Sequence, residues 1–176
     1  MRIISGQHKG RKIRAPKNLP VRPTTDRAKE GLFNILQHRF DLNQVQVLDL
    51  FAGTGNISYE FASRGAASVT AIDQNRHCVQ FIQNTATALE MSISAIQSGT
   101  LEFLKQQKTT YDLIFADPPY DFELEVYTKM IALTESLLSP EGIFIVEHDK
   151  HIDLSQIKGF NDNRTYGNNV FSFFSF

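Results

Sequence analysis

The residue types best suited to chemistry stand in the segment Asp117-Pro118-Pro119-Tyr120, which follows an apolar run at 111–116. Each proline fixes its own φ and keeps the preceding residue extended, so Asp117 and Pro118 are held rigidly. The Asp117 carboxylate and the Pro118 carbonyl can accept both hydrogens of an aromatic exocyclic amine and turn its lone pair toward a methyl donor. Tyr120 can stack on the ring, which is worth about 1–3 kcal/mol. An ordinary Asp-Pro-Pro turn is the alternative, but a place at a strand end favours catalysis.

A second candidate site is the glycine loop, Asp49-Leu50-Phe51-Ala52-Gly53-Thr54-Gly55-Asn56. It follows an apolar run and opens an expected helix, which is where open α/β sheets bind ligands. Gly53 and Gly55 let the backbone approach a ligand closely, and a helix N-terminus favours an anionic group. Ser58 stands where a dinucleotide fingerprint usually has glycine, so a nicotinamide cofactor is less favoured. A strand-to-helix turn that only needs flexible residues is the alternative.

A third candidate is Asp73, which ends an apolar run 20 residues beyond Gly53. A carboxylate at this distance from a glycine loop can accept both hydroxyl groups of a ribose through charge-assisted hydrogen bonds. Acids at strand ends also cap the following helix, which is the simpler interpretation. The spacing to the glycine loop favours ribose binding.

Apolar runs and helical patterns alternate from residue 45 onward, which predicts an α/β fold with a mostly parallel sheet covered on both faces. The expected strands are 45–51, 67–73, 92–97, 111–117 and 142–148, and the expected helices are 56–65, 75–90, 99–107 and 123–138. Before them, Thr25 or Asp26 is expected to cap an amphipathic helix. After them, RTYG and NVFSFFSF are expected to form an antiparallel hairpin around a Gly-Asn-Asn turn, with the aromatic residues in the core.

The charges are unevenly distributed, although the net charge is only −1. Residues 1–39 carry a balance of +8, and the remaining residues carry −9. A basic segment on an acidic body suggests a polyanionic partner, with a solvated extension as the alternative. The segment is expected to form a short β-hairpin followed by an extended strap. Its candidate phosphate contacts are Lys9, Arg11, Lys12, Arg14 and Lys17.

The composition indicates one compact domain, because 176 residues, 41% of them apolar, can bury a core without disulfides or metal. The one cysteine, Cys78, cannot pair within the chain, which favours a reducing compartment. No run reaches the roughly 18–20 apolar residues of a membrane span, and the N-terminus lacks a secretory signal, so a cytoplasmic protein is expected. The histidines show no metal-ligand spacing, and no metal is expected.

In this order and spacing, FAGTGN, Asp73 and DPPY resemble the motifs of class I S-adenosylmethionine-dependent methyltransferases that act on amino groups. RIISGQHKGRKI and RPTTDRAKEGLFNIL narrow the resemblance to the RsmD-like family of 16S rRNA guanine-N2 methyltransferases, over nearly the whole chain. The resemblance implies a Rossmann-like sheet of seven strands and S-adenosylmethionine as cofactor. It also implies that the target is a guanine N2 amine in 16S ribosomal RNA or in an assembling small subunit.

The resemblance further implies how the chain is divided. Residues 1–24 are expected to form an RNA-binding extension and residues 25–176 the methyltransferase domain, acting as a monomer. Thr24, Thr25 and Arg27 are expected near the methionine end of the cofactor. The expected cofactor residues are Thr25, Asp49, Phe51, Ala52, Gly53, Thr54, Gly55 and Asp73, and the expected catalytic residues are Asp117, Pro118, Pro119 and Tyr120.

Two positions depart from the family pattern. Ser58 stands where the family often has glycine, and Gly99-Thr100 stands where many relatives have an Asp or Asn that contacts adenine. A backbone N–H at residue 99 could serve the adenine instead.

Other functions remain open. A DNA adenine-N6 or protein-glutamine methyltransferase would share the Asp-Pro-Pro-Tyr segment but would not account for the basic N-terminal pattern. A nicotinamide-dependent oxidoreductase would share the glycine loop and Asp73 but not that segment. A non-catalytic RNA-binding relative would keep the basic segment and lose affinity for the cofactor.

Overall fold

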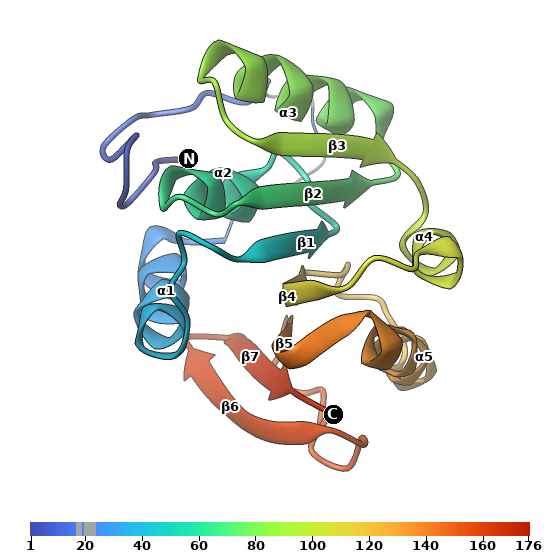
Figure 1. The fold of residues 1–176 in the computed structure, drawn as a ribbon. Helices are drawn as coiled ribbons and strands as arrows, with labels where there is room; N and C mark the ends of the chain where they lie inside the picture. Colours follow the sequence, from blue (N-terminus) through green and yellow to red (C-terminus); the bar gives the residue numbers. More distant parts are fainter. Residues whose placement is uncertain (17–18, 20–23) are drawn as a thin grey trace.

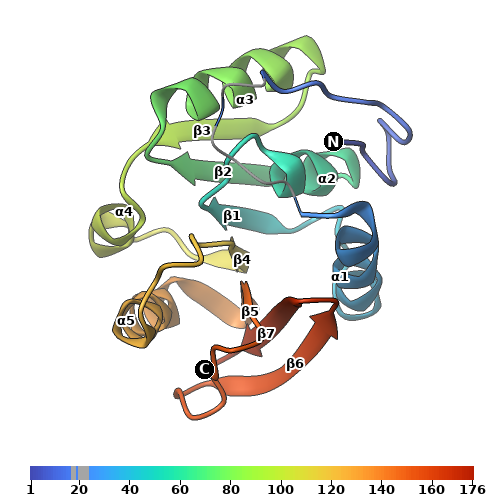
Figure 2. The ribbon, with the colours of Figure 1, turned by 180° about the vertical axis from the view of Figure 1, so that it is seen from behind.

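The computed structural model describes residues 1–16, 19 and 24–176, which fold around one seven-stranded sheet (Figures 1 and 2). The strand order is β3-β2-β1-β4-β5-β7-β6, with β7 antiparallel to both of its neighbours. This confirms the predicted Rossmann-like class I fold with a closing hairpin. The strands are β1 (Gln46–Leu50), β2 (Ser68–Asp73), β3 (Ile93–Gln97), β4 (Tyr111–Ala116), β5 (Leu138–Asp149), β6 (Phe160–Tyr166) and β7 (Asn169–Phe174). The helices are α1 (Asp26–Arg39), α2 (Asn56–Ser63), α3 (Arg76–Ala88), α4 (Thr100–Gln106), α5 (Leu124–Thr134) and a 3₁₀ turn, η1 (Glu135–Leu137).

The sheet separates two layers of helices, because successive side chains of a strand point to opposite faces. In β1, Val47 packs in a cluster with residues of α1 and α2, whereas Leu48 packs in a cluster with residues of α4 and α5. Helix α3 lies in the first layer, where Ile82 contacts a cluster that includes Ala71 of β2. Helices α1, α2 and α3 therefore cover one face and α4 and α5 the other, as Figure 1 shows.

The strand order produces a crevice at the carboxyl edge of the sheet. From β1 the chain adds β2 and β3 on one side and then returns to add β4 on the other. Leu50 of β1 consequently pairs with Ile72 on one side and with Ala116 on the other. The next residues of the neighbouring strands, Asp73 and Asp117, flank the glycine loop at this edge. Open α/β sheets bind ligands at such a switch point.

The helix predicted over 123–138 is wrong at its C-terminal end. Helix α5 stops at Thr134, and after one 3₁₀ turn Leu138 already pairs with Tyr111 as the first residue of β5. The helical path ends at Leu138, whose backbone is extended, with φ −88° and ψ 138°.

The closing hairpin contains the expected core strand. In β7, Phe171 and Phe174 are fully buried. Strand β6 begins at Phe160, earlier than the RTYG segment from which it was predicted.

The expected N-terminal β-hairpin is reduced to one isolated antiparallel bridge between Arg2 and Lys12. The apolar side chains of this segment, Ile3 and Ile13, are buried in a cluster with residues of α2 and α3. The Ile13 N–H also donates to the carbonyl of Met1 at 3.0 Å. The segment is therefore packed against the body of the protein. Most of the expected strap, including Lys17, lies outside the described residues.

Candidate active site

A cavity of about 660 Å³ opens at the carboxyl edge of the sheet, where the three candidate sites meet. Ligand pockets commonly enclose about 300–1,000 Å³. Its lining includes the expected residues Asp49, Phe51, Ala52, Gly53, Thr54, Asp73, Asp117, Pro118, Pro119 and Tyr120. Of the other expected cofactor residues, Gly55 caps α2 directly behind this lining, and Thr25 lies in a neighbouring cavity.

The glycine loop turns sharply between β1 and α2. Gly53 has a φ of +55° and Gly55 a φ of +85°, a conformation that glycine adopts at little steric cost. A Cβ on Gly55 would lie 2.8 Å from the Tyr59 ring, so no larger residue fits there. Phe51 also has a positive φ, +63°, and its ring meets that of Phe122 edge-on at 5.5 Å. The turn brings the N-terminus of α2 to the cavity, where it favours an anionic group.

Asp73 is joined to the glycine loop by a hydrogen bond. The Gly53 N–H donates to Oδ2 of Asp73 at 2.8 Å, and the Asn75 N–H donates to Oδ1 at 2.7 Å. The N-cap of α3 is Asn75, whose side chain accepts from the first turn of the helix, so Asp73 does not cap it. Burial raises the pKa of Asp73, and the two backbone donors oppose that rise. Each carboxylate oxygen keeps a lone pair that can accept from a ribose hydroxyl.

Asp49 lies at the floor of the cavity and is fully buried. Burial raises the pKa of Asp49 to about 7, and a hydrogen bond from Ser58 opposes this rise. The Ser58 hydroxyl donates to Oδ2 of Asp49 at 2.5 Å. Ser58, which stands where the family often has glycine, therefore donates a hydrogen bond to a buried carboxyl group.

The Asp-Pro-Pro-Tyr segment leaves β4 and enters the cavity. Asp117 is partly buried. Burial raises its pKa well above the ordinary value, and the carboxylates of Glu147 and Asp49 raise it further. Tyr120 has 54% of its surface exposed, an unusual position for a large aromatic side chain. The segment thus presents a carboxyl group inside the cavity and an aromatic ring at its mouth.

A second cavity of about 340 Å³ adjoins the first and shares Thr24, Asp117 and Tyr120 with it. Glu147 and Asn169 also line this second cavity, although the sequence assigned Asn169 only to a turn and Glu147 to no role. An acid inside the apolar run 142–148 is a signal that could have identified Glu147. The remaining lining residues are Thr25, Arg27, Ala28, Thr165, Tyr166, Gly167 and Asn168.

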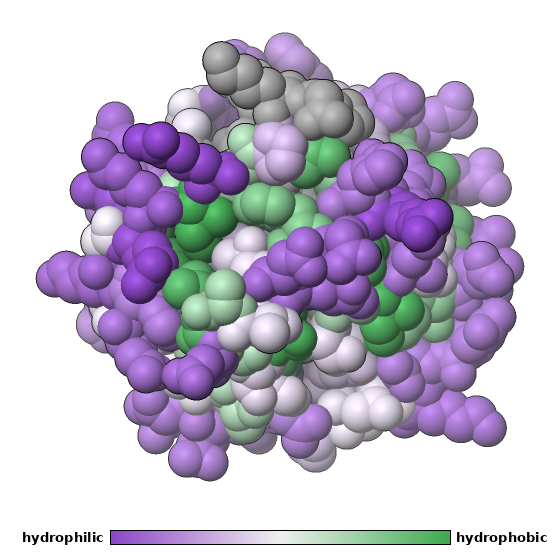
Figure 3. All heavy atoms as spheres, turned by 90° about the horizontal axis from the view of Figure 1, so that it is seen from above, coloured by the Kyte–Doolittle hydropathy of each residue, from purple (hydrophilic) through white to green (hydrophobic). Residues whose placement is uncertain are grey.

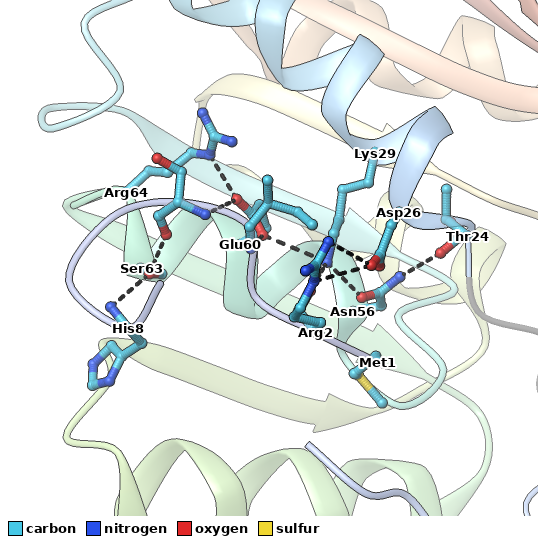
Figure 4. A network of polar contacts seen from close by, with 12 residues as sticks. Met1, Arg2, His8, Thr24, Asp26, Lys29, Asn56, Glu60, Ser63 and Arg64 are labelled. Atoms are coloured by element: carbon cyan, nitrogen blue, oxygen red, sulfur yellow. Dashed lines mark hydrogen bonds and ion pairs between the residues drawn. The ribbon is translucent and has the colours of Figure 1, made fainter. Parts of the chain in front are cut away.

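A buried polar network holds α1 and the N-terminal segment against α2 (Figure 4). Lys29 is 1% exposed, and its ammonium donates to the Arg2 carbonyl at 2.6 Å and to Oδ1 of Asn56 at 2.9 Å. It also lies 3.5 Å from Oε2 of the fully buried Glu60. Asn56 in turn donates to the carbonyl of Thr24 at 2.9 Å. The network therefore fixes Thr24 at the junction of the two cavities.

The basic side chains of the N-terminal segment point to solvent. Lys9, Arg11, Lys12 and Arg14 are all exposed. Figure 3 views the molecule from the side of α3 and shows a mostly hydrophilic face. In residues 1–16, 19 and 24–176 no helix is long and apolar enough to cross a membrane, and no three acidic, histidine or cysteine side chains gather in a way that could hold a metal ion.

Comparison with known proteins finds a family, a curated relative and a solved structure that are similar to this chain. The family model described as Conserved hypothetical protein 95 matches residues 1–175. Ribosomal RNA small subunit methyltransferase D of Escherichia coli is 37% identical over 150 residues, which cover 85% of this chain and 75% of that protein. The solved structure of Escherichia coli yhhF superposes with a TM-score of 0.86 at 29% identity and covers 99% of this chain and 96% of that one.

A more distant likeness shows the fold alone. The Thermus thermophilus 16S rRNA N2 methyltransferase RsmC, solved in complex with AdoMet and guanosine, has a TM-score of 0.71 at 22% identity. The likeness covers 89% of this chain and 44% of that one.

Proposed function

Because the chain belongs to the Conserved hypothetical protein 95 family, which includes ribosomal RNA small subunit methyltransferase D, we propose that it methylates the N2 amine of a guanine in 16S ribosomal RNA with S-adenosylmethionine. One observation carries the proposal: two cavities, of about 660 and 340 Å³, meet at Asp117 and Tyr120. A methyl transfer brings a donor and an acceptor into contact at the reacting atoms, and the two adjoining cavities offer one place for each.

The larger cavity fits S-adenosylmethionine in the chemistry of its lining. Its glycine loop and the N-terminus of α2 offer N–H groups to a carboxylate. Asp73 has lone pairs free for two ribose hydroxyls. Nothing lies within 4 Å of the position that a Cβ on Gly99 would take, so the backbone of Gly99 is open to a ligand. Bound there, S-adenosylmethionine supplies a methyl carbon on a sulfonium, whose sulfur keeps the electron pair when the bond to that carbon breaks.

The smaller cavity is the proposed place of the base. Tyr120 stacks on the guanine, while the Asp117 carboxylate and the Pro118 carbonyl accept the hydrogens of its amine. These hydrogen bonds reduce the delocalisation of the nitrogen lone pair into the ring. The lone pair then points toward the larger cavity. Catalysis is then mainly positioning and preorganised hydrogen bonding, and the proton released from nitrogen passes to water.

The N-terminal segment is proposed to contact the RNA backbone. Lys9, Arg11, Lys12 and Arg14 are exposed on a segment that the buried Lys29 network ties to the cofactor side of the molecule. Phosphate contacts of this kind give affinity without base specificity.

The test is methylation of 16S ribosomal RNA, and of small subunits, from cells lacking the protein, with labelled S-adenosylmethionine. Nucleoside mass spectrometry of the product should give N2-methylguanosine. Label in N6-methyladenosine, or label only in protein, would reject the proposal. Calorimetry should show binding of S-adenosylmethionine and none of NAD, which separates a methyltransferase from an oxidoreductase and from a non-catalytic relative.

A further inference from the structure

Asp117 and Glu147 stand side by side on the same face of the sheet. Ala116 of β4 pairs with Val146 of β5 in a parallel register, so the next residue of each chain occupies the next row. Successive side chains alternate between faces, which places both acids on the face covered by α1. The influence of the Glu147 carboxylate on the pKa of Asp117 agrees with this proximity.

Within the described part of the chain, two side chains hydrogen-bond to Glu147 in the second cavity. The Thr24 hydroxyl donates to its Oε2 at 3.3 Å, and the Asn169 side-chain amide donates to its Oε1. The side chain is only 2% exposed, and no cation within residues 24–176 forms an ion pair with it. Two donors do not saturate a carboxylate, which has about four lone-pair sites. A buried acceptor with spare capacity is costly unless a ligand satisfies it.

The edges of guanine and adenine differ in what they offer to such an acceptor. Guanine presents an N1–H donor directly beside its N2 amine, whereas adenine presents an N1 lone pair beside its amine. A carboxylate accepts hydrogen bonds and cannot donate them, so it attracts the guanine edge and repels the adenine edge. A carboxylate beside the amine acceptor Asp117 is therefore placed to discriminate between them.

We propose that Glu147 determines base specificity by accepting the N1–H of the target guanine, while Thr24 and Asn169 hold its carboxylate in place. This inference rests on the proposed methylation of guanine and names the side chain that selects it. Burial raises the pKa of Glu147 to about 7, opposed by the bonds from Asn169 and Thr24, so the group is a carboxylate at pH 8.5.

The experiment compares two bases in three proteins. RNA substrates carry guanine or 2-aminopurine at the methylated position; 2-aminopurine keeps the C2 amine but has a lone pair at N1. Single-turnover methyl transfer is measured at pH 8.5 for the wild type and for Glu147→Gln, with Glu125→Gln on the exposed side of α5 as the matched control. The loss of O6 in 2-aminopurine affects all three proteins, so it cancels when their rate ratios are compared.

The wild type and the control should both prefer guanine strongly. Glu147→Gln should lower the guanine to 2-aminopurine rate ratio at least tenfold, because an amide can donate to N1 and no longer carries a charge that repels its lone pair. Affinity for S-adenosylmethionine should change less than twofold, since Glu147 lines only the second cavity. An unchanged ratio, whether or not both rates fall together, would overturn the inference. A wild type that methylates neither base would instead reject the proposed function.

Discussion

The Gly53 N–H donates to Oδ2 of Asp73 at 2.8 Å, so the same carboxylate that can bind a ribose also holds the glycine loop in its turn. The ribose site and the loop beside it are consequently one unit. A change at Asp73 affects the ribose site and the glycine loop, whereas a change at the cap residue Asn75 affects the N-terminus of α3.

Asp73→Ala should weaken S-adenosylmethionine binding tenfold or more. One charge-assisted hydrogen bond is worth about 1.5–3 kcal/mol, and the variant loses bonds to the ribose and to the loop. The protein should stay folded because Asn75, rather than Asp73, caps α3. Titration calorimetry measures the affinity, and circular dichroism checks the fold. A folded variant with unchanged affinity would show that the ribose lies elsewhere.

Asp117→Ala should slow methyl transfer about 10²- to 10³-fold, the usual cost of losing one preorganised electrostatic contact. The backbone path should persist because Pro118 and Pro119 still restrict it. Single-turnover kinetics with saturating cofactor on the methylated RNA fragment isolates the chemical step. Tyr120→Ala serves as the comparison and should raise KM as well as slow transfer, because it removes base stacking. Wild-type rates in Asp117→Ala would refute the role of its carboxylate.

Gly99→Asp should tighten S-adenosylmethionine binding by about three- to tenfold, through a hydrogen bond to the adenine amine. The position can accept a side chain, since φ is −70° and nothing lies within 4 Å of an added Cβ. Gly99 is also the N-cap of α4, where aspartate is a favoured residue. Melting temperature without ligand and calorimetry with ligand separate the two effects. Higher stability at unchanged affinity would mean that the new side chain only caps the helix.

Removing the exposed N-terminal charges should weaken RNA binding in a salt-dependent way. Each phosphate contact to a single strand contributes about −0.7 to the slope of log affinity against log salt, so the loss of four contacts should flatten this slope by about 2.8. Point substitutions are needed because deletion would remove Ile3 and Ile13 from the core. The variant replaces Lys9, Arg11, Lys12 and Arg14 with glutamine, and the charge-matched control replaces the exposed Lys105, Lys108, Lys129 and Lys158.

Cofactor affinity should be the same in both of these variants. A slope that the N-terminal substitutions leave unchanged, or that the control flattens equally, would show that the RNA is held by other residues.

The sheet and the positions of the three motifs could be predicted from the sequence because they depend on local patterns. Apolar runs mark strands, and glycine or proline marks the turns after β1 and β4. The parallel sheet then brings the strand ends together whatever the details of packing. The end of α5 was mispredicted because Leu138 continues the apolar pattern of the helix while pairing with Tyr111 in the sheet.

The second cavity could not be predicted in the same way, because its residues come from parts of the chain that only the folded structure joins. Glu147 belongs to β5, Asn169 to β7 and Thr24 to the entry of α1, and no sequence spacing relates them. The buried position of Lys29 could not be predicted either, because one lysine in an amphipathic helix is normally exposed.

The buried pair of Lys29 and Glu60 limits how this part of the protein can evolve. Losing Glu60 leaves the Lys29 ammonium buried without a counter-charge, which costs about 3–5 kcal/mol, a large share of the stability of a domain of this size. Losing Lys29 leaves the Glu60 carboxylate paired with Arg64 at 2.8 Å. Lineages that descend from this sequence should therefore lose Glu60 only after Lys29, and proteins that keep Lys29 without an acid at position 60 should be rare.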